Sequence, residues 1–149
     1  MIALGSDHAG RDLKKIIMQH LEAKGIACRD YGWPGEPAPV DYPIYGLAAA
    51  KAVAGGECEK GIVICGTGIG ISLVANKVQG IRCALCSEPY SALMSREHND
   101  ANMLALGARV IGPELAKMIV DTWLQGQFQG GNHAPRVEMI KTIEKTGAL

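Results

Sequence analysis

The fold of this chain is indicated by the stretch Gly61-Ile-Val-Ile-Cys-Gly-Thr-Gly-Ile-Gly-Ile-Ser72, in which an apolar run ends at one cysteine and a glycine-rich turn follows. This pattern predicts a buried strand, a tight turn and then a helix. Parallel α/β sheets bind ligands at the carboxyl ends of their strands, so Cys65 is predicted to lie where a ligand binds. The backbone amides that follow would face an anion from a helix N-terminus. The stretch therefore indicates a thiol beside an anion cradle, and chemistry on a phosphorylated or enolising substrate.

The same alternation of apolar runs and amphipathic segments extends in both directions from this stretch. It predicts strands over residues 1–6, 26–31, 61–65, 82–86 and 103–106, and helices over residues 10–24, 42–54, 69–77, 88–97, 113–124 and from 135 onward. Residues 33–43 hold four prolines and are predicted to form a loop. Such alternation is typical of an α/β fold with a mostly parallel sheet. At 149 residues the chain is predicted to be a single domain, residues 1–149, whose last helix packs on a partner subunit.

The composition excludes several classes of partner. Hydrophobic residues make up 48% of the chain, and its 15 Lys and Arg residues balance its 15 Asp and Glu residues. A net charge of zero favours neither nucleic acid nor an acidic membrane surface. No apolar run approaches the ~18 residues that span a bilayer, and the first residues lack the basic leader of a signal peptide. We therefore expect a cytoplasmic protein with no nucleic-acid and no membrane partner.

The five cysteines do not follow the spacing of a disulfide scaffold or of a zinc site. Their number is odd, and no second cysteine pair or histidine pair stands at zinc spacing. Cys83 and Cys86 match C-x-x-C, but residues three apart on a strand face opposite sides. We favour small buried side chains for this pair, with a thiol redox function as the alternative.

Three common phosphate-binding motifs do not fit the glycine-rich turn. A dinucleotide-binding G-x-G-x-x-G would need glycine at Ile71, and a P-loop would need lysine at Thr67. A cysteine phosphatase loop would need arginine six residues after Cys65, which is again the position of Ile71. The predicted anion cradle therefore stands without a nucleotide-binding or phosphocysteine motif.

Polar residues at the ends of predicted elements are candidates for the rest of a site. Cys65 could serve chemistry or be a core thiol, since free cysteines are among the most buried residues. Asp7 and His8 could cap the first helix or hold sugar hydroxyls. Residues 98–102, His-Asn-Asp-Ala-Asn, could simply end a helix or could form part of a sugar site. Three basic residues could bind phosphate but are not assigned by composition alone: Arg109, His133 and Arg136.

Six short segments, taken in their order and spacing, resemble the ribose-5-phosphate isomerase B family. They are Asp7-His-Ala-Gly10, Asp41-Tyr-Pro43, Cys65-Gly-Thr-Gly-Ile-Gly-Ile-Ser72, Ala75-Asn-Lys77, Ser87-Glu-Pro-Tyr90 and Arg96-Glu-His-Asn-Asp100. The resemblance covers essentially the whole chain. It implies a Rossmann-like three-layer α/β/α sandwich with a five-stranded parallel sheet, assembled as a homodimer or tetramer with active sites between subunits.

The resemblance also implies an activity and a mechanism. The reaction would interconvert D-ribose 5-phosphate and D-ribulose 5-phosphate in the pentose phosphate pathway, without a metal or other cofactor, and allose 6-phosphate is a possible further substrate. Cys65, as thiolate, would remove the C2 proton of the open-chain aldose and return it at C1. The enediolate would be stabilised by the backbone amides of Gly66, Gly68, Ile69 and Gly70. Thr67 would hydrogen-bond near the reacting oxygens, and His98 from a neighbouring subunit would open the furanose ring.

Further residues would hold the sugar phosphate, again by resemblance. The hydroxyls would be bound by Asp7, His8 and Asn99, and Asp41 would orient one of the histidines. The phosphate would be bound by Arg109, His133 and Arg136. Asn132 would add an amide where family members carry a basic residue, so the phosphate pocket is expected to be less positive, which leaves a six-carbon sugar phosphate as an alternative.

Ile71 separates two variants of this family. In one variant a glutamate at this position is the base and the cysteine is absent, whereas this chain has Ile71 and keeps Cys65. The chain is therefore expected to be of the cysteine-base type. The alternative from another class of protein is a non-catalytic module that binds phosphate or nucleotide through the same glycine turn.

Overall fold

The computed structural model describes residues 1–33, 35–36 and 38–149, so Pro34 and Pro37 of the predicted loop lie outside the described residues. The elements are β1 (Ile2–Ser6), α1 (Arg11–Ala23), β2 (Cys28–Asp30), α2 (Tyr42–Ala54), β3 (Lys60–Cys65), α3 (Ile69–Ala75), β4 (Cys83–Leu85), α4 (Pro89–Glu97), β5 (Met103–Gly107), α5 (Pro113–Gln125), the 3₁₀ helix η1 (Gly131–His133) and α6 (Ala134–Thr146). The predicted α/β fold is confirmed, and element ends differ from the prediction by at most two residues. Within the described ranges, no helix is long and apolar enough to cross a membrane.

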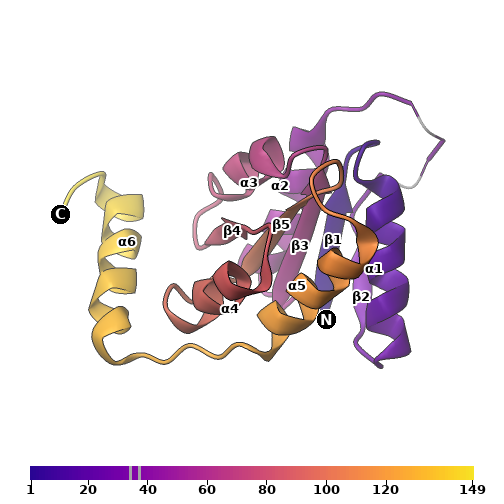
Figure 1. Ribbon diagram of the computed structural model, residues 1–149. Helices are drawn as coiled ribbons and strands as arrows, with labels where there is room; N and C mark the ends of the chain where they lie inside the picture. Colours follow the sequence, from indigo (N-terminus) through magenta and orange to yellow (C-terminus); the bar gives the residue numbers. More distant parts are fainter. Residues whose placement is uncertain (34, 37) are drawn as a thin grey trace.

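All five strands are parallel and lie in the order β2-β1-β3-β5-β4 (Figure 1). From β1 the chain moves outward to β2, whereas from β3 it moves to the opposite side of the sheet. The carboxyl ends of β1 and β3 are adjacent, since Ser6 pairs with Ile64. Open α/β sheets bind their ligands where the strand order reverses in this way. The crevice between β1 and β3 is therefore the expected site.

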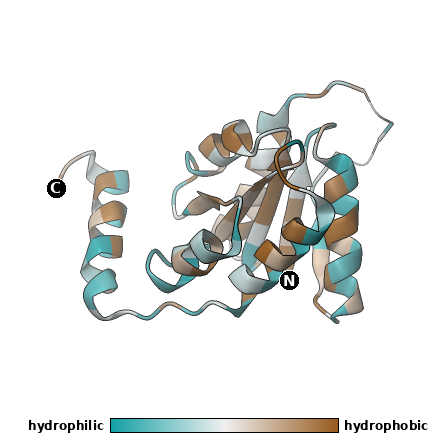
Figure 2. Ribbon diagram, viewed as in Figure 1, coloured by the Kyte–Doolittle hydropathy of each residue, from teal (hydrophilic) through white to brown (hydrophobic). Residues whose placement is uncertain are grey.

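Helices cover both faces of the sheet, which gives the predicted three layers. Along β3, Ile62 and Ile64 join the core cluster of α1, α4 and α5, whereas Val63 and Cys65 join the cluster of α2 and α3. Successive side chains of a strand face opposite sides, so a strand covered on both faces is apolar throughout. Hydrophobic residues accordingly fill the central strands and the inward sides of the helices (Figure 2). The apolar run before Cys65 is this doubly buried strand.

The start of α1 lies against the end of β3. A Cβ atom on Gly10, the N-cap of α1, would lie only 2.4 Å from the carbonyl oxygen of Ile64 and 2.7 Å from its carbonyl carbon. The Gly10 N–H donates to Asp7 Oδ1 at 3.0 Å. This close approach holds Asp7 next to the strand that ends at Cys65.

The last helix stands apart from the sheet. An extended segment leads from α5 to α6, which lies beyond α4 and β4 (Figure 1). Gly80 N–H donates to the two carboxylate oxygens of Glu144 at 3.1 and 3.0 Å, and Val137 is the buried residue of the helix. Ile140 and Ile143 face a cavity of about 500 Å³ between α6 and the β4 side of the molecule. The expectation that α6 packs on a partner subunit stays a prediction, and its half-exposed isoleucines support it.

The contact at Gly10 predicts a specific loss of stability. Gly10→Ala forces a methyl group into backbone atoms of β3 that cannot move away, and overpacking of this kind costs about 1–3 kcal/mol. For a chain of this length, each kcal/mol lowers the Tm by about 2–4 °C. Gly112→Ala is the matched control, because Gly112 is also an N-cap, has φ −83° and would place its Cβ in open space. Equal Tm values for the two variants would contradict the steric role of Gly10.

Candidate functional site

Cys65 ends β3 as a buried thiol with a backbone donor directed at its sulfur. Only 4% of the residue is exposed, and the Gly68 N–H donates to Sγ at 3.1 Å. Gly68 has φ +78°, which favours glycine, and a Cβ there would also lie 2.9 Å from the carbonyl carbon of Leu106. The turn therefore depends on glycine at position 68 and curls its amide back onto the thiol.

The rest of the turn presents polar groups at the carboxyl edge of the sheet. The Ile69 N–H donates to Thr67 Oγ1 at 3.2 Å, and Thr67 is exposed. Gly70 lies in the first turn of α3, where N–H groups have no acceptor within the helix. Of the predicted amide donors, those of Gly68 and Ile69 are thus engaged by the loop itself.

Tyr42 is a neighbour of this turn that the sequence analysis did not assign to the site. A Cβ on Gly70 would lie 2.6 Å from Tyr42 Cζ and 2.8 Å from its hydroxyl oxygen, so the ring lies directly over the glycine. Tyr42 is 38% exposed, so its hydroxyl is open to a ligand at the turn. The sequence signal for Tyr42 was the segment Asp41-Tyr-Pro43, one of the six segments that carry the family resemblance.

Asp7 and His8 follow β1 at the same edge. Asp7 accepts the Gly10 N–H in the turn before α1, and the helix itself has no side-chain cap among the described residues. The Val40 N–H donates to His8 Nδ1 at 3.1 Å, which in a neutral imidazole leaves the proton on Nε2, free to donate to a ligand. The partner of His8 in the described residues is thus Val40, and the orienting role of Asp41 stays a prediction.

Arg109 also belongs to this edge. Its N–H donates to the carbonyl of Gly66 at 2.9 Å, directly after β5. Its guanidinium lies over Gly66, where an added Cβ would be 3.4 Å from Nη1. A guanidinium, which can bind an anion through two N–H groups, therefore lies over the residue that follows Cys65, where an anionic group of a substrate can bind. We name Asp7, His8, Tyr42, Cys65–Gly70 and Arg109 the thiol half-site.

The remaining predicted residues gather at the opposite edge of the sheet. His98 is the C-cap of α4, and its ring stacks on that of His133 with centroids 4.1 Å apart and an interplanar angle of 11°. Asn102, four residues after His98, accepts the Gly61 N–H at the start of β3. Cys65 lies four residues after Gly61 along β3, which places it about 13 Å from the Gly61–Asn102 contact at ~3.3 Å per residue. We name His98, Asn99, Asn132, His133 and Arg136 the histidine half-site.

One chain therefore does not bring Cys65 and His98 together. The thiol half-site lies at the carboxyl edge of the sheet and the histidine half-site at the amino edge. A reaction that uses both groups needs the carboxyl edge of one subunit against the amino edge of another.

The charge of the histidine half-site comes from arginine rather than from His133. Desolvation, followed by the nearby His98 and Arg136, lowers the pKa of His133, so its neutral form is favoured at pH 7. Asn132 lies in η1 and carries no charge. Arg136 is the permanent positive charge here for a phosphate.

Cys83 and Cys86 are free thiols with raised pKa values. Burial raises the pKa of Cys83 to about 12 and that of Cys86 to about 11. Redox-active thiols require a thiolate near neutral pH, so the redox alternative is not supported. Among the described residues, no three His, Cys, Asp or Glu side chains cluster as metal ligands would.

Sequence comparison relates the chain to isomerases. The Ribose/Galactose Isomerase family profile matches residues 2–140. The chain is 57% identical to ribose-5-phosphate isomerase B of Escherichia coli (strain K12) over 145 residues, 97% of this chain and 96% of that protein. It is 49% identical to D-erythrulose-4-phosphate isomerase of Pectobacterium atrosepticum, with 96% and 94% covered.

Solved structures agree with the sequence comparison. Ribose-5-phosphate isomerase B of Clostridium thermocellum superposes with a TM-score of 0.96 at 57% identity over 99% of each chain. The enzyme of Mycoplasma genitalium with bound ribulose-5-phosphate superposes with a TM-score of 0.93 at 38% identity over 97% of this chain and 96% of that one.

The raised thiol pKa values predict the labelling of two cysteines. At pH 8, well below pKa values of about 12 and about 11, Cys83 and Cys86 of the folded protein stay protonated. We expect iodoacetamide to leave both unmodified by mass spectrometry, and to modify both once the protein is unfolded in denaturant. Rapid labelling of either thiol in the folded protein would show that its thiolate is accessible.

Proposed function

Because this chain belongs to the ribose/galactose isomerase family, we propose that it interconverts D-ribose 5-phosphate and D-ribulose 5-phosphate. The observation that carries the proposal is the buried Cys65 with the Gly68 amide on its sulfur, at the crevice between β1 and β3. The proposal is supported by the ribose-5-phosphate isomerase B relative at 57% identity and by the ribulose-5-phosphate bound to the Mycoplasma genitalium enzyme.

In the proposed reaction Cys65 is the base. Its thiolate removes the C2 proton of the open-chain aldose, the C–H electron pair forms the C1–C2 double bond, and O1 takes the negative charge. The same sulfur returns the proton to C1 while the O2 hydroxyl proton passes to O1, which gives the ketose. The Gly68 N–H donates to this sulfur at 3.1 Å, so the base has a backbone hydrogen-bond donor at the crevice.

The transient charge on O1 and O2 needs donors at the carboxyl edge. Thr67 Oγ1 accepts the Ile69 N–H, so its own hydroxyl proton is available to a substrate oxygen. The first-turn amide of Gly70 and the Tyr42 hydroxyl above it are further donors. Preorganised donors of this kind stabilise an enediolate without reorganisation during the reaction.

Ring opening is assigned to a second copy of the chain. His98 lies at the amino edge, so in a homodimer it would complete the thiol half-site of the partner, with Arg136 binding the phosphate. An isologous interface repeats the arrangement and forms two equal sites. The exposed apolar side chains of α6 provide surface for such an interface.

Substrate length is a separate question within the same reaction. The relative at 49% identity is a D-erythrulose-4-phosphate isomerase, so a four-carbon sugar phosphate is a second candidate substrate. Uncharged Asn132 also leaves allose 6-phosphate as a side substrate. Steady-state rates across four-, five- and six-carbon sugar phosphates rank these substrates, and no turnover of any of them would exclude the isomerase function.

Replacement of the base separates catalysis from binding. We expect Cys65→Ala to lower kcat for D-ribose 5-phosphate about 10³-fold while the Kd of the sugar phosphate, measured by calorimetry, changes little. Cys28→Ala, at a half-buried cysteine on β2, is the control and should keep wild-type rates. Full turnover by Cys65→Ala would exclude this base, and sugar-phosphate binding without turnover by wild type would favour the non-catalytic module.

Mixed dimers test whether two chains share each site. Cys65→Ala and His98→Ala homodimers each lack one group in both sites. A heterodimer of the two has one site with both native groups, so random assembly of equal amounts should recover about a quarter of wild-type activity. Subunits that each held a complete site would give no recovery on mixing.

A further inference from the structure

We propose that Arg82 is a positioning residue for the ring-opening group, through a clamp on the turn that carries His98 and Asn99. The clamp consists of Arg82, Arg96 and Asp100. The inference rests on the proposed isomerase function, because it assigns Arg82 an effect on one step of that reaction. It concerns side chains that touch no reacting atom.

The turn between α4 and β5 is tightly bent. The His98 N–H still donates to the carbonyl of Met94, at 2.8 Å, and the Ala101 N–H donates to that of Ser95 at 2.9 Å. Asp100, between them, has φ +47° and is the non-glycine residue with positive φ in the described part of the chain. Left-handed backbone is uncommon for a residue with a Cβ, although Asp and Asn adopt it more readily than others, and contacts from neighbouring side chains stabilise it here.

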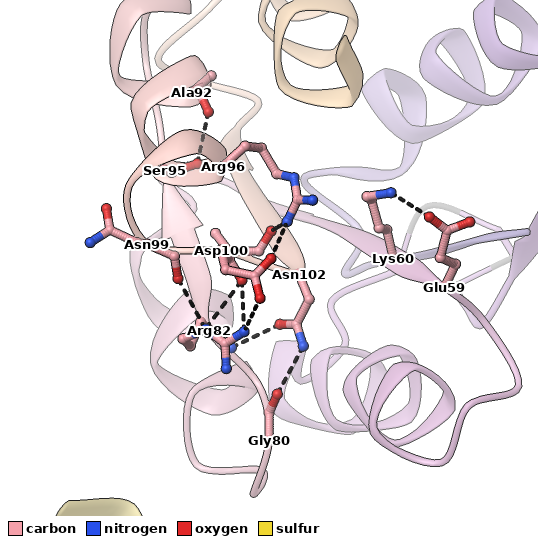
Figure 3. A network of polar contacts seen from close by, with 11 residues as sticks. Glu59, Lys60, Gly80, Arg82, Ala92, Ser95, Arg96, Asn99, Asp100 and Asn102 are labelled. Atoms are coloured by element: carbon pink, nitrogen blue, oxygen red, sulfur yellow. Dashed lines mark hydrogen bonds and ion pairs between the residues drawn. The ribbon is translucent and has the colours of Figure 1, made fainter. Parts of the chain in front are cut away.

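Arg82 supplies most of that restraint (Figure 3). Its Nε donates to the carbonyls of Asn99 at 3.0 Å and Asp100 at 3.1 Å. Its Nη2 donates to the Asp100 carbonyl at 2.8 Å and to Asp100 Oδ2 at 3.0 Å. One guanidinium therefore holds two successive carbonyls and a carboxylate, which a single ammonium cannot do with the same fork geometry.

Arg96 closes the clamp from the other side. Its Nη1 donates to Asp100 Oδ1 at 3.2 Å and to the carbonyl of Ala101. The side chains of Arg82 and Arg96 are only 16% and 11% exposed, so both depend on the Asp100 carboxylate for their charge partner. Carbonyls 99 to 101 are thus all occupied by arginine donors.

Asn102 fixes the position of Arg82 itself. Its side-chain oxygen accepts the Arg82 N–H at 2.8 Å, and its amide donates to the carbonyl of Gly80 at 2.8 Å. The clamp is therefore tied to the start of β4 as well as to the end of α4. It is a rigid base for the two side chains that the turn presents.

The side chains of His98 and Asn99 take no part in the clamp. Figure 3 shows the Asn99 amide directed away from the arginines, while its carbonyl accepts from Arg82. The His98 ring stacks on His133. In the part of the chain that the structure describes, neither side chain makes a hydrogen bond, so both can bond to a substrate, and their position is set by the backbone that Arg82 holds. A displacement of a catalytic group by about 1 Å can cost about 100-fold in rate.

Only one of the two sugars needs ring opening, the step that is assigned to His98 on this turn. D-ribose 5-phosphate is mainly a furanose and must be opened before Cys65 can act. D-ribulose 5-phosphate is acyclic, because the oxygen that would close its five-membered ring carries the phosphate. The overall equilibrium constant fixes the ratio of kcat/KM in the two directions, so no variant can change that ratio. The two kcat values can change independently, and a slower ring opening lowers the kcat with ribose 5-phosphate alone.

The experiment measures both directions in wild type, Arg82→Lys and Arg82→Gln. For Arg82→Gln we expect kcat with ribose 5-phosphate to fall about 10- to 100-fold, with a parallel fall in KM as unopened sugar fills the site. We expect kcat with ribulose 5-phosphate to change by less than about 3-fold. The kcat of Arg82→Lys with ribose 5-phosphate should lie between those of wild type and Arg82→Gln, since lysine keeps the charge but not the fork of donors.

Two further variants control the measurement. Asp100→Asn keeps a residue that tolerates left-handed backbone and removes the carboxylate that both arginines share. It should therefore also lower kcat with ribose 5-phosphate and leave kcat with ribulose 5-phosphate nearly unchanged. Arg29→Gln, at an exposed arginine paired with Glu57, should change neither. If thermal melting shows that Arg82→Gln is unfolded, Arg82→Lys and Asp100→Asn carry the test.

The outcomes separate this inference from the proposed function. If the Arg82 variants lose kcat equally with both sugars, or with neither, the positioning role of Arg82 is wrong while the isomerase function stands. A wild-type protein with no turnover of either sugar would overturn the function, and the positioning role with it.

Discussion

The hydrogen bonds of β3 to β1 on one side and to β5 on the other hold the central strand on which the site depends. The strand is buried on both faces after Lys60, so it is apolar from Gly61 to Cys65. Its parallel register places Cys65 next to the end of β1 and the end of β5. Asp7, His8 and Arg109 come from different parts of the chain and lie at the same edge as the thiol because their strands end there.

The same parallel topology keeps the other half of the site away. A helix that connects parallel strands runs back across the sheet, so its last residues lie at the amino edge. His98 ends such a helix, whereas Cys65 ends a strand, and no local rearrangement brings the two ends together. The proposed site shared between two copies would follow directly from this parallel topology. The apolar side chains that α6 exposes are consistent with this proposal.

Much of the fold followed from local patterns. The predicted strands and helices match because apolar periodicity and glycine or proline boundaries are properties of neighbouring residues. The contacts that shape the site are not local: Tyr42 lies over Gly70, Val40 donates to His8, and Arg82 holds Asp100. In each case the partners come from segments that are far apart in the sequence. Their pairing depends on which strands are adjacent, and the strand order was not predicted.

The sequence by itself determined the α/β class, the position of Cys65 at the end of a buried strand and the glycine turn after it. These features are encoded within a few successive residues, where side-chain period and backbone freedom leave few alternatives. Only the tertiary structure decided the order β2-β1-β3-β5-β4, the division into two half-sites and the arginine clamp under His98. The physical reason is that packing of distant segments sets these features. A short-range pattern carries no record of which distant segments meet.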